Sequence, residues 1–164
     1  TAIIALLGGT GIRVSELVGI DLNDIDWEHN CIRIIRKGGN EDIVYFGDEL
    51  HRYLEDYINY EREPGDDKEK ALFIASRKDK GRLTVRSVER IVSKYGTATI
   101  PSKHLSPHSL RRTFGTNYYE ETSDLYAVAD ALGHKNIQVT KDHYADISER
   151  KKQQVKEFSD KLLK

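Results

Sequence analysis

Apolar residues recur at helical spacing through much of the chain. Residues 2–7 form a continuous apolar run, which predicts a buried helix that ends near residues 8–9. A turn at 10–11 leads into a second short helix through 14–18, and the apolar positions within 50–58 again mark one helix face. The pattern predicts helices on both sides of a central segment that has a different character.

That central segment has the composition of a β-hairpin. Residues 31–35 and 43–46 are rich in β-branched and aromatic side chains, which favour strands. Between them, residues 37–40 (KGGN) have the chemistry of a tight turn, because glycine adopts a positive φ without steric cost. A short apolar run at 71–74 predicts a third strand.

Helical patterns return in the second half. A threonine at 84 precedes an apolar helix face, and a serine and proline at 106–107 are typical of a helix start. Residue 123 or 124 caps a further helix that ends at 133, and an amphipathic helix covers 148–164. The apolar stripe of that last helix consists of Val155, Phe158 and Leu162. The predicted fold class is α+β, mainly helical, with a small antiparallel sheet of about three strands on one edge.

Composition is consistent with one folded domain. The 164 residues are 38% hydrophobic and 32% charged, which allows a core and argues against disorder. No apolar run reaches the roughly 20 residues that a membrane-spanning helix needs, and the single Cys31 cannot form an internal disulfide. Because the sequence has no methionine and begins inside an apolar stretch, we interpret residues 1–164 as a domain of a longer protein.

Charge is distributed unevenly along the chain. The net charge is −1, but residues 76–112 hold ten Lys and Arg against two acids, so this segment is +8 and the rest is −9. Such a segment is typical of a surface that binds nucleic acid. A solvated surface that is balanced by acids elsewhere in the fold is an equally good interpretation of charge alone.

Two motifs in the first half carry a cation. In the motif TGIRVSEL, Arg13 follows a glycine turn at a predicted helix start, which directs its guanidinium away from the core. On its own, a surface ion pair with Glu16 is the simpler interpretation. Lys37 lies in the hairpin turn, where a lysine is either an inert surface residue or an ammonium that a mobile tip delivers into a cleft as a proton donor.

Two motifs in the second half add imidazoles, an arginine and a tyrosine. His108 and Arg111 are three residues apart on a predicted helix and share a face that suits a phosphate, with ordinary surface charge as the alternative. His134 follows Gly133, where a histidine often only caps a helix, and Tyr144 comes ten residues later. Neither residue points to chemistry by itself.

In combination these motifs resemble the catalytic domain of the tyrosine recombinases, the phage-integrase family of site-specific DNA recombinases. The motifs are TGIRVSEL, RKGGNEDIVYF, HSLRRTFGT, LGHKNIQVT and DHYAD, and together they cover about residues 3–146. Five motifs in the family's order, with 23 residues from Arg111 to His134, form a specific signal. In style the chain is most similar to integrases of prophages and conjugative transposons.

The resemblance implies a role for each candidate. The six catalytic positions of the family correspond to Arg13, Lys37, His108, Arg111, His134 and Tyr144. The arginines would bind the phosphate oxygens with permanently charged forks, the lysine would protonate the leaving oxygen, and the tyrosine would be the nucleophile. A phenol has a pKa of about 10, so it needs a base or local positive charge to attack. Glu16 corresponds to the acidic residue that follows the first arginine in the family and orients the site.

The implied activity is site-specific DNA recombination. The enzyme would cut and rejoin DNA by transesterification through a covalent 3′-phosphotyrosine intermediate, without a metal, ATP or another cofactor. Its partners would be double-stranded DNA, three further copies in a homotetramer on paired sites, and accessory DNA-bending proteins, with no membrane. It would be a monomer when free, in the bacterial cytoplasm and at the nucleoid when bound. The family's N-terminal DNA-binding domains are expected to be absent from residues 1–164.

Two alternatives share features of this interpretation. A catalytically silent DNA-binding relative would keep the fold and the basic face but lose one of the six groups, and all six are present. A type IB topoisomerase would share the chemistry, but the motif spacings and size favour an integrase. The chain also departs from the family where Glu41 and Asp42 follow the hairpin lysine, which is expected to weaken contact with a DNA backbone.

Overall fold

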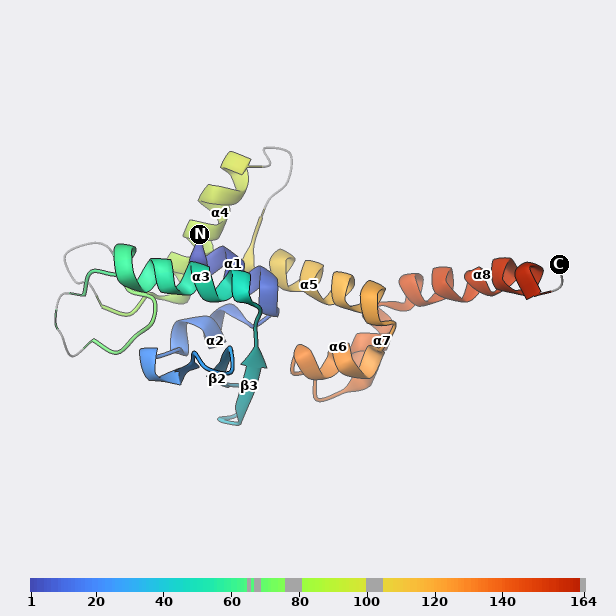
Figure 1. Ribbon diagram of the computed structural model, residues 1–164, viewed down its shortest axis with the longest axis horizontal. Coiled ribbons are helices and arrows are strands. Elements are labelled where there is room, and N and C mark those ends of the chain that lie inside the picture. Colours follow the sequence, from blue (N-terminus) through green and yellow to red (C-terminus); the bar gives the residue numbers. More distant parts are fainter. Residues whose placement is uncertain (65, 67–68, 76–80, 100–104, 163–164) are drawn as a thin grey trace. The chain divides into compact units, whose positions relative to one another are not determined.

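The computed structural model describes residues 1–64, 66, 69–75, 81–99 and 105–162 (Figure 1). The chain divides into two compact units, which we call unit 1 (residues 1–114) and unit 2 (residues 115–164). Unit 1 combines helices with an antiparallel sheet of three strands, and the described part of unit 2 is built from helices. The predicted mainly helical α+β fold is confirmed.

Two helices joined by a tight turn open unit 1. α1 (Ala2–Thr10) continues through both glycines at which its end was predicted and stops before Gly11, whose φ is 66°. Burial of the apolar run around those glycines outweighs the roughly 1 kcal/mol that each costs a helix. The Gly11 N–H donates to the Leu7 carbonyl over 3.0 Å, and α2 (Val14–Gly19) begins three residues later, with Arg13 at its N-cap.

The predicted hairpin forms the larger part of the sheet. β2 (Cys31–Ile35) pairs antiparallel with β3 (Glu41–Tyr45), and Arg33 stands opposite Ile43. Along β2, Ile32 and Ile34 are buried while the residues between and after them are exposed, the alternation expected of a strand with one face on the core.

The third strand is not the one that the sequence predicted. β1 (Ile25–Asp26), which follows a 3₁₀ turn η1 (Leu22–Asp24), pairs with the other edge of β2. Residues 71–74 form no ladder: Ala71 bridges to one segment and Ile74 to another. The prediction of a strand there is wrong, because these apolar side chains fill the core rather than extend the sheet.

The core of unit 1 lies among α1, α2, the inner face of the sheet and two further helices. These are α3 (Asp48–Asp56), which continues as a π-helical turn η2 (Tyr57–Glu61), and α4 (Val85–Thr99). The predicted cap of α4 is present, since the Ser87 N–H donates to the Thr84 hydroxyl over 3.2 Å. The side chains with the least exposure in this core are Leu6, Leu7, Leu17, Leu54, Leu72, Val88 and Val92.

Helix α5 (Pro107–Thr122) spans the boundary between the two units. It begins as predicted, with the Ser109 N–H donating to the Ser106 hydroxyl over 3.1 Å. In unit 2, α6 (Leu125–Ala131) is capped by Asp124, the second of the two residues proposed for that role. The sequence therefore identified the starts of these helices through their capping chemistry.

The end of the chain contains two helices where one was predicted. α7 (Ile137–His143) was not expected, and α8 (Ala145–Leu162) begins three residues before the predicted start. Val155, the first residue of the predicted apolar stripe, is 64% exposed. The side chains of the other two stripe residues lie outside the described part of the structure.

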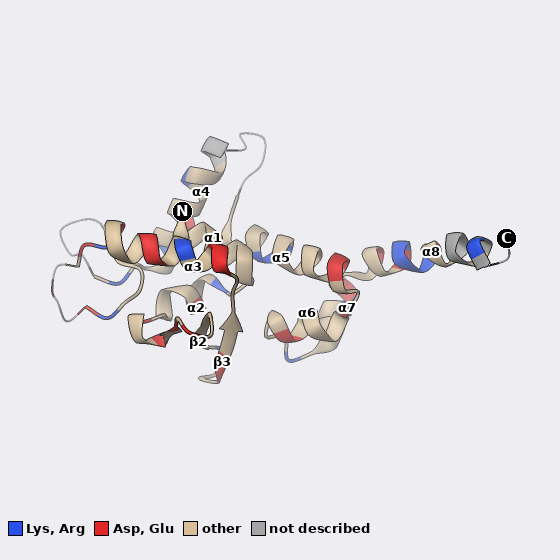
Figure 2. Ribbon diagram, viewed as in Figure 1, with Lys and Arg blue, Asp and Glu red and all other residues tan. Residues whose placement is uncertain are grey.

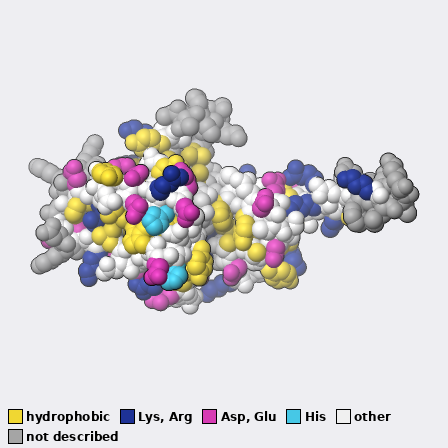
Figure 3. Space-filling model, in the orientation of Figure 1, with side chains coloured by type: hydrophobic (Ala, Val, Ile, Leu, Met, Phe, Trp, Pro, Cys, Tyr) yellow, Lys and Arg dark blue, Asp and Glu magenta, His cyan; other side chains and the backbone are white. Residues whose placement is uncertain are grey.

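Acidic and basic residues are interspersed over the helices rather than separated into blocks (Figure 2). The face of the molecule in Figure 3 likewise mixes acidic, basic, histidine and hydrophobic side chains. Every helix in the described ranges is too short or too polar to cross a bilayer.

The single cysteine provides a test of this packing. Cys31 is buried in β2, and that burial, together with the charge of Asp26, raises the pKa of its thiol. Because the thiolate is the reactive form, we expect iodoacetamide to alkylate the native chain slowly at about pH 8 and the urea-unfolded chain rapidly. Mass spectrometry over time measures both rates, and equal rates would contradict the described position of this strand.

Candidate active site

Glu16 is the centre of the first cluster of candidate residues. Its side chain is 2% exposed and accepts two bonds from one arginine, from the Arg13 N–H over 2.7 Å and from Arg13 Nη1 over 2.9 Å. The ion pair that the spacing suggested is therefore present. It holds the Arg13 guanidinium at the start of α2, where the side chain remains 35% exposed.

Lys37 of the hairpin turn directly follows a residue that binds the same carboxylate. Lys37 is exposed, and the two glycines after it have φ values of 92° and 81°, as the turn requires. The residue before it, Arg36, is buried and pairs through Nη1 with Glu16 Oε2 at 3.3 Å and through Nε with Asp42 Oδ2 at 2.8 Å. Glu16 thus connects the start of α2 to the base of the hairpin.

Arg111 reaches the turn before α2 from another direction. Its Nη1 donates to the Gly11 carbonyl over 2.5 Å, which anchors the guanidinium two residues from Arg13 in the sequence. The carbonyl is available because Gly11 ends α1 in a left-handed conformation. The two arginines proposed to bind a phosphate are therefore both attached to one short segment of unit 1.

His108 lies one helical turn before Arg111 and lines a groove of about 460 Å³. Val14 lines the same groove, and so do Arg86 and Arg90 of α4. Of the ten cations in the basic segment, Arg77, Lys78, Lys80 and Lys103 lie outside the described residues. The described ones place two arginines of one helix face beside a candidate catalytic imidazole.

His134 is held in unit 2 by a buried threonine. Its Nδ1 is 2.9 Å from the hydroxyl of Thr140, which is fully buried, and its N–H donates to the Ala129 carbonyl over 2.8 Å. The second bond is the helix-capping role considered for this residue. The first bond involves one of the two ring nitrogens, so Thr140 constrains the orientation of the imidazole.

Tyr144 belongs to unit 2 and is buried, with 2% of its surface exposed. Its ring packs edge-on against His143 at 4.8 Å and lies 5.6 Å from the Tyr119 ring. A methyl group added at Gly115 would overlap the Tyr144 hydroxyl and lie 3.0 Å from Leu132 Cδ1. The absence of a side chain at residue 115 is therefore what allows the phenol to lie against α5.

The candidate residues fall into two groups, one in each unit. Unit 1 joins Arg13, Arg111 and the Lys37 turn around the segment that follows α1, with His108 in an adjoining groove. Unit 2 joins the other two candidates through Thr140, whose hydroxyl bonds His134 and whose carbonyl accepts the Tyr144 N–H at 3.1 Å. Among the described residues, no three His, Cys, Asp or Glu are grouped so as to hold a metal ion.

Three residues of these groups were not identified from the sequence. These are Thr140, Gly115 and Arg36, and all three lie inside recognised motifs. The four-residue spacing from Thr140 to Tyr144 is a signal that could have identified a shared helix face. Arg36 gave no such signal, because its partner Glu16 is 20 residues away.

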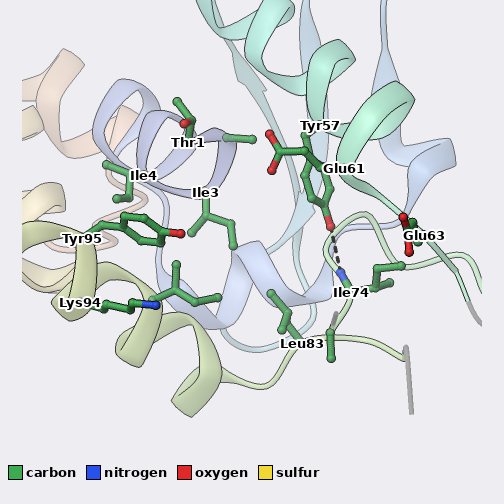
Figure 4. Close-up of a pocket in the computed structure, with 13 residues that line it drawn as sticks. Thr1, Ile3, Ile4, Tyr57, Glu61, Glu63, Ile74, Leu83, Lys94 and Tyr95 are labelled. Carbon is green, nitrogen blue, oxygen red and sulfur yellow. Dashed lines mark hydrogen bonds between the residues drawn. The ribbon is translucent and has the colours of Figure 1, made fainter. Parts of the chain in front are cut away.

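A cavity of about 590 Å³ lies elsewhere in unit 1 and contains none of the six candidates (Figure 4). Ile3, Ile4 and Leu83 line it together with Tyr57, whose hydroxyl accepts the Ile74 N–H over 3.2 Å. Burial raises the pKa of the Tyr57 phenol. The walls are mostly apolar, so this cavity does not resemble a phosphate site.

Residues 1–151 match the model of the phage integrase family. The tyrosine recombinase XerC of Corynebacterium glutamicum is 41% identical over 140 residues, which cover 85% of this chain and 44% of that protein. The crystal structure of XerA recombinase superimposes with a TM-score of 0.76 and 26% identity, over 87% of this chain and 51% of that one. The crystal structure of XerH site-specific recombinase bound to difH substrate, in a pre-cleavage complex, superimposes with a TM-score of 0.74 and 25% identity. The match covers 87% of this chain and 41% of that one. The chain thus spans about half the length of the proteins that it matches.

The contact between His134 and Thr140 can be tested with a matched pair of variants. Thr140→Val keeps the volume but removes the hydroxyl, so the His134 tautomer ratio should change about threefold to tenfold, the effect of one neutral hydrogen bond. Thr140→Ser should retain the native ratio. Nitrogen-15 NMR of the imidazole measures it, and identical spectra for Val and Thr would show that this hydrogen bond does not orient the ring.

The packing of Tyr144 against Gly115 gives a second test. Gly115→Ala should push the ring out of its pocket, because the helix backbone cannot retreat, and should destabilise the chain by about 1–3 kcal/mol. Urea unfolding and mapped nitration of Tyr144 measure the two effects. Gly19→Ala is the control, since nothing lies within 4 Å of its added methyl. A stable Gly115→Ala variant with Tyr144 still protected would contradict the described contact.

Proposed function

Because this chain belongs to the phage integrase family, we propose that it is the catalytic domain of a tyrosine-type site-specific DNA recombinase. The observation that carries the proposal is the attachment of two arginines to one turn: Arg13 is fixed by Glu16, and Arg111 donates to the Gly11 carbonyl. Two planar, permanently charged forks near one another are suited to the two non-bridging oxygens of a phosphodiester.

The proposed reaction is a transesterification at phosphorus. The Tyr144 oxygen forms a bond to the phosphorus and the bond from phosphorus to the 5′ oxygen breaks, which leaves a 3′-phosphotyrosine. The two arginines stabilise the charge that builds up on the phosphate oxygens in the transition state. The new ester keeps the energy of the phosphodiester, so attack by the 5′-hydroxyl of another strand rejoins the DNA without ATP.

Two protons move in this step. The Tyr144 phenol loses one, and His108 is the candidate base that takes it up. The departing 5′ oxygen gains one, and the exposed Lys37 ammonium in the hairpin turn is the candidate acid. The His134 imidazole, whose Nδ1 lies 2.9 Å from the Thr140 hydroxyl, would form a hydrogen bond to a phosphate oxygen.

Double-stranded DNA is the proposed partner. Arg86 and Arg90 line the groove that also contains His108, and guanidinium groups beside the reacting phosphate would bind the neighbouring phosphates of the backbone. Binding that rests on such contacts weakens steeply as salt concentration rises. We further propose that the whole protein, with its additional domains, acts as a tetramer on paired sites in the bacterial cytoplasm, as an integrase of a mobile element.

A catalytically silent DNA-binding relative is the second candidate. The burial of Tyr144 favours it, because a residue that is only 2% exposed offers a phosphate little access to its phenol. The recombinase proposal requires this side chain to leave its pocket when DNA binds.

Covalent trapping distinguishes the two candidates. The chain is mixed with nicked duplexes that lose a short fragment on cleavage, in EDTA, and the products are denatured in SDS. We expect an adduct that peptide mass mapping assigns to Tyr144. Tyr144→Phe should bind duplex DNA as the native chain does but form no adduct, because it lacks only the nucleophilic oxygen. An adduct that persists in this variant would exclude Tyr144 as the nucleophile, and salt-sensitive binding without any adduct would favour the silent relative.

A further inference from the structure

Arg36 closes the turn that carries Lys37. It follows the last residue of β2, its N–H donates to the Asn40 carbonyl over 2.7 Å, and its carbonyl accepts the Gly39 N–H over 3.0 Å. Lys37 therefore lies inside the turn that these two hydrogen bonds close. An interaction that fixes the position of Arg36 therefore also restricts the conformations of the turn.

The side chain of Arg36 forms such interactions. It is 9% exposed and binds two carboxylates, Glu16 of α2 and Asp42 of β3. Glu16 is itself buried and also holds Arg13. The four charges form a chain, Arg13–Glu16–Arg36–Asp42, in which cations and anions alternate and cancel. Its two ends are the start of α2 and the far strand of the hairpin.

The geometry requires an arginine at this position. The guanidinium uses Nε toward one carboxylate and Nη1 toward the other, so its planar fork spans two partners at once. An ammonium is a single point of charge and would have to favour one of them. A buried carboxylate that loses one of two cationic partners is also a costly defect, because the pair was removed from water together.

We propose that Arg36 is a positioning residue that couples the Lys37 turn to the Arg13 segment through Glu16. A lysine followed by two glycines in a hairpin turn can adopt many positions. A misplacement of about 1 Å can slow a proton transfer a hundredfold. The anchor reduces that sampling. The catalytic half of this inference rests on the proposed function, because it gives Lys37 the role of acid, whereas the structural coupling does not.

The structural half is tested by amide hydrogen exchange on the whole chain, and no activity is needed. Arg36→Lys should speed exchange about tenfold both at Gly39 and at Arg13, whose N–H is bonded to Glu16, as expected when a charged hydrogen bond is weakened. The matched control is Arg33→Lys in β2, three residues before Arg36, at an exposed arginine that pairs with Asp24 and Glu41 instead. A change at Gly39 alone, or equal changes in the control, would overturn the coupling.

The catalytic half is tested with a duplex in which sulfur replaces the bridging 5′ oxygen. A thiol ionises near pH 8.5, so a thiolate leaves without needing the proton that Lys37 would supply. On the oxygen substrate, Arg36→Lys should slow cleavage about 10- to 100-fold without weakening DNA binding. On the sulfur substrate most of that loss should disappear, as it should for Lys37→Ala, and the control should behave as the native chain does on both.

The outcomes separate this inference from the function on which it rests. If the native chain forms adducts but Arg36→Lys is equally slow on both substrates, Arg36 does not act through Lys37. If the native chain forms no adduct on either substrate, the proposed function fails, and the exchange measurement still decides whether Arg36 couples the two segments. Thermal unfolding of both lysine variants shows whether each is folded when it is measured.

Discussion

The candidate site of unit 1 depends on one buried carboxylate. Glu16 is almost inaccessible to solvent and binds Arg13 and Arg36, which belong to segments that the chain brings together only on folding. Removing one partner from a buried ion pair typically costs about 3–5 kcal/mol, because the remaining charge is left without water or a counter-ion. The arrangement therefore fixes where two cations lie more firmly than surface pairs can, since those contribute at most about 1 kcal/mol. Arg111 is attached to the same segment through the Gly11 carbonyl, so the position of the proposed phosphate site follows from the end of α1.

In unit 2 the candidate residues are positioned by hydrogen bonds and packing rather than by ion pairs. Thr140 has no charge, yet through its hydroxyl and its carbonyl it contacts both His134 and the backbone of Tyr144. Lys151 strengthens the adjoining packing: its ammonium donates to the Tyr119 and Glu120 carbonyls over 2.8 Å and lies 4.8 Å from the Tyr119 ring, which is itself beside Tyr144. Unit 1 thus holds its groups with charges, and unit 2 holds the proposed nucleophile by burial and hydrogen bonds. A buried phenol is protected from side reactions, and the proposed reaction requires it to become accessible to the phosphate.

Much of this could be predicted from local sequence. The hairpin, the caps at Thr84, Ser106 and Asp124, and the turn after α1 each have a short-range cause, a glycine or a capping oxygen within a few residues. The errors arose where long-range packing decided the result. An apolar run at 71–74 looked like a strand although its side chains fill the core, and α7 was missed because seven residues show too little periodicity. The family's motifs located candidate residues, but the contact between Arg36 and Glu16 joins residues whose proximity no local pattern reveals.

The acidic hairpin illustrates why charge in a sequence differs from charge on a surface. From the sequence, Glu41 and Asp42 were expected to weaken the contact of the hairpin with a DNA backbone. In the structure Glu41 pairs with Arg33 and Asp42 pairs with Arg36, so the strands balance their own charges. Residues 33–42 contain three cations and two acids. With the two arginines paired, Lys37 accounts for the net charge of +1. The carboxylates therefore reduce the attraction for phosphate much less than their number implies. One of them, by binding Arg36, helps to hold the turn from which that lysine would act.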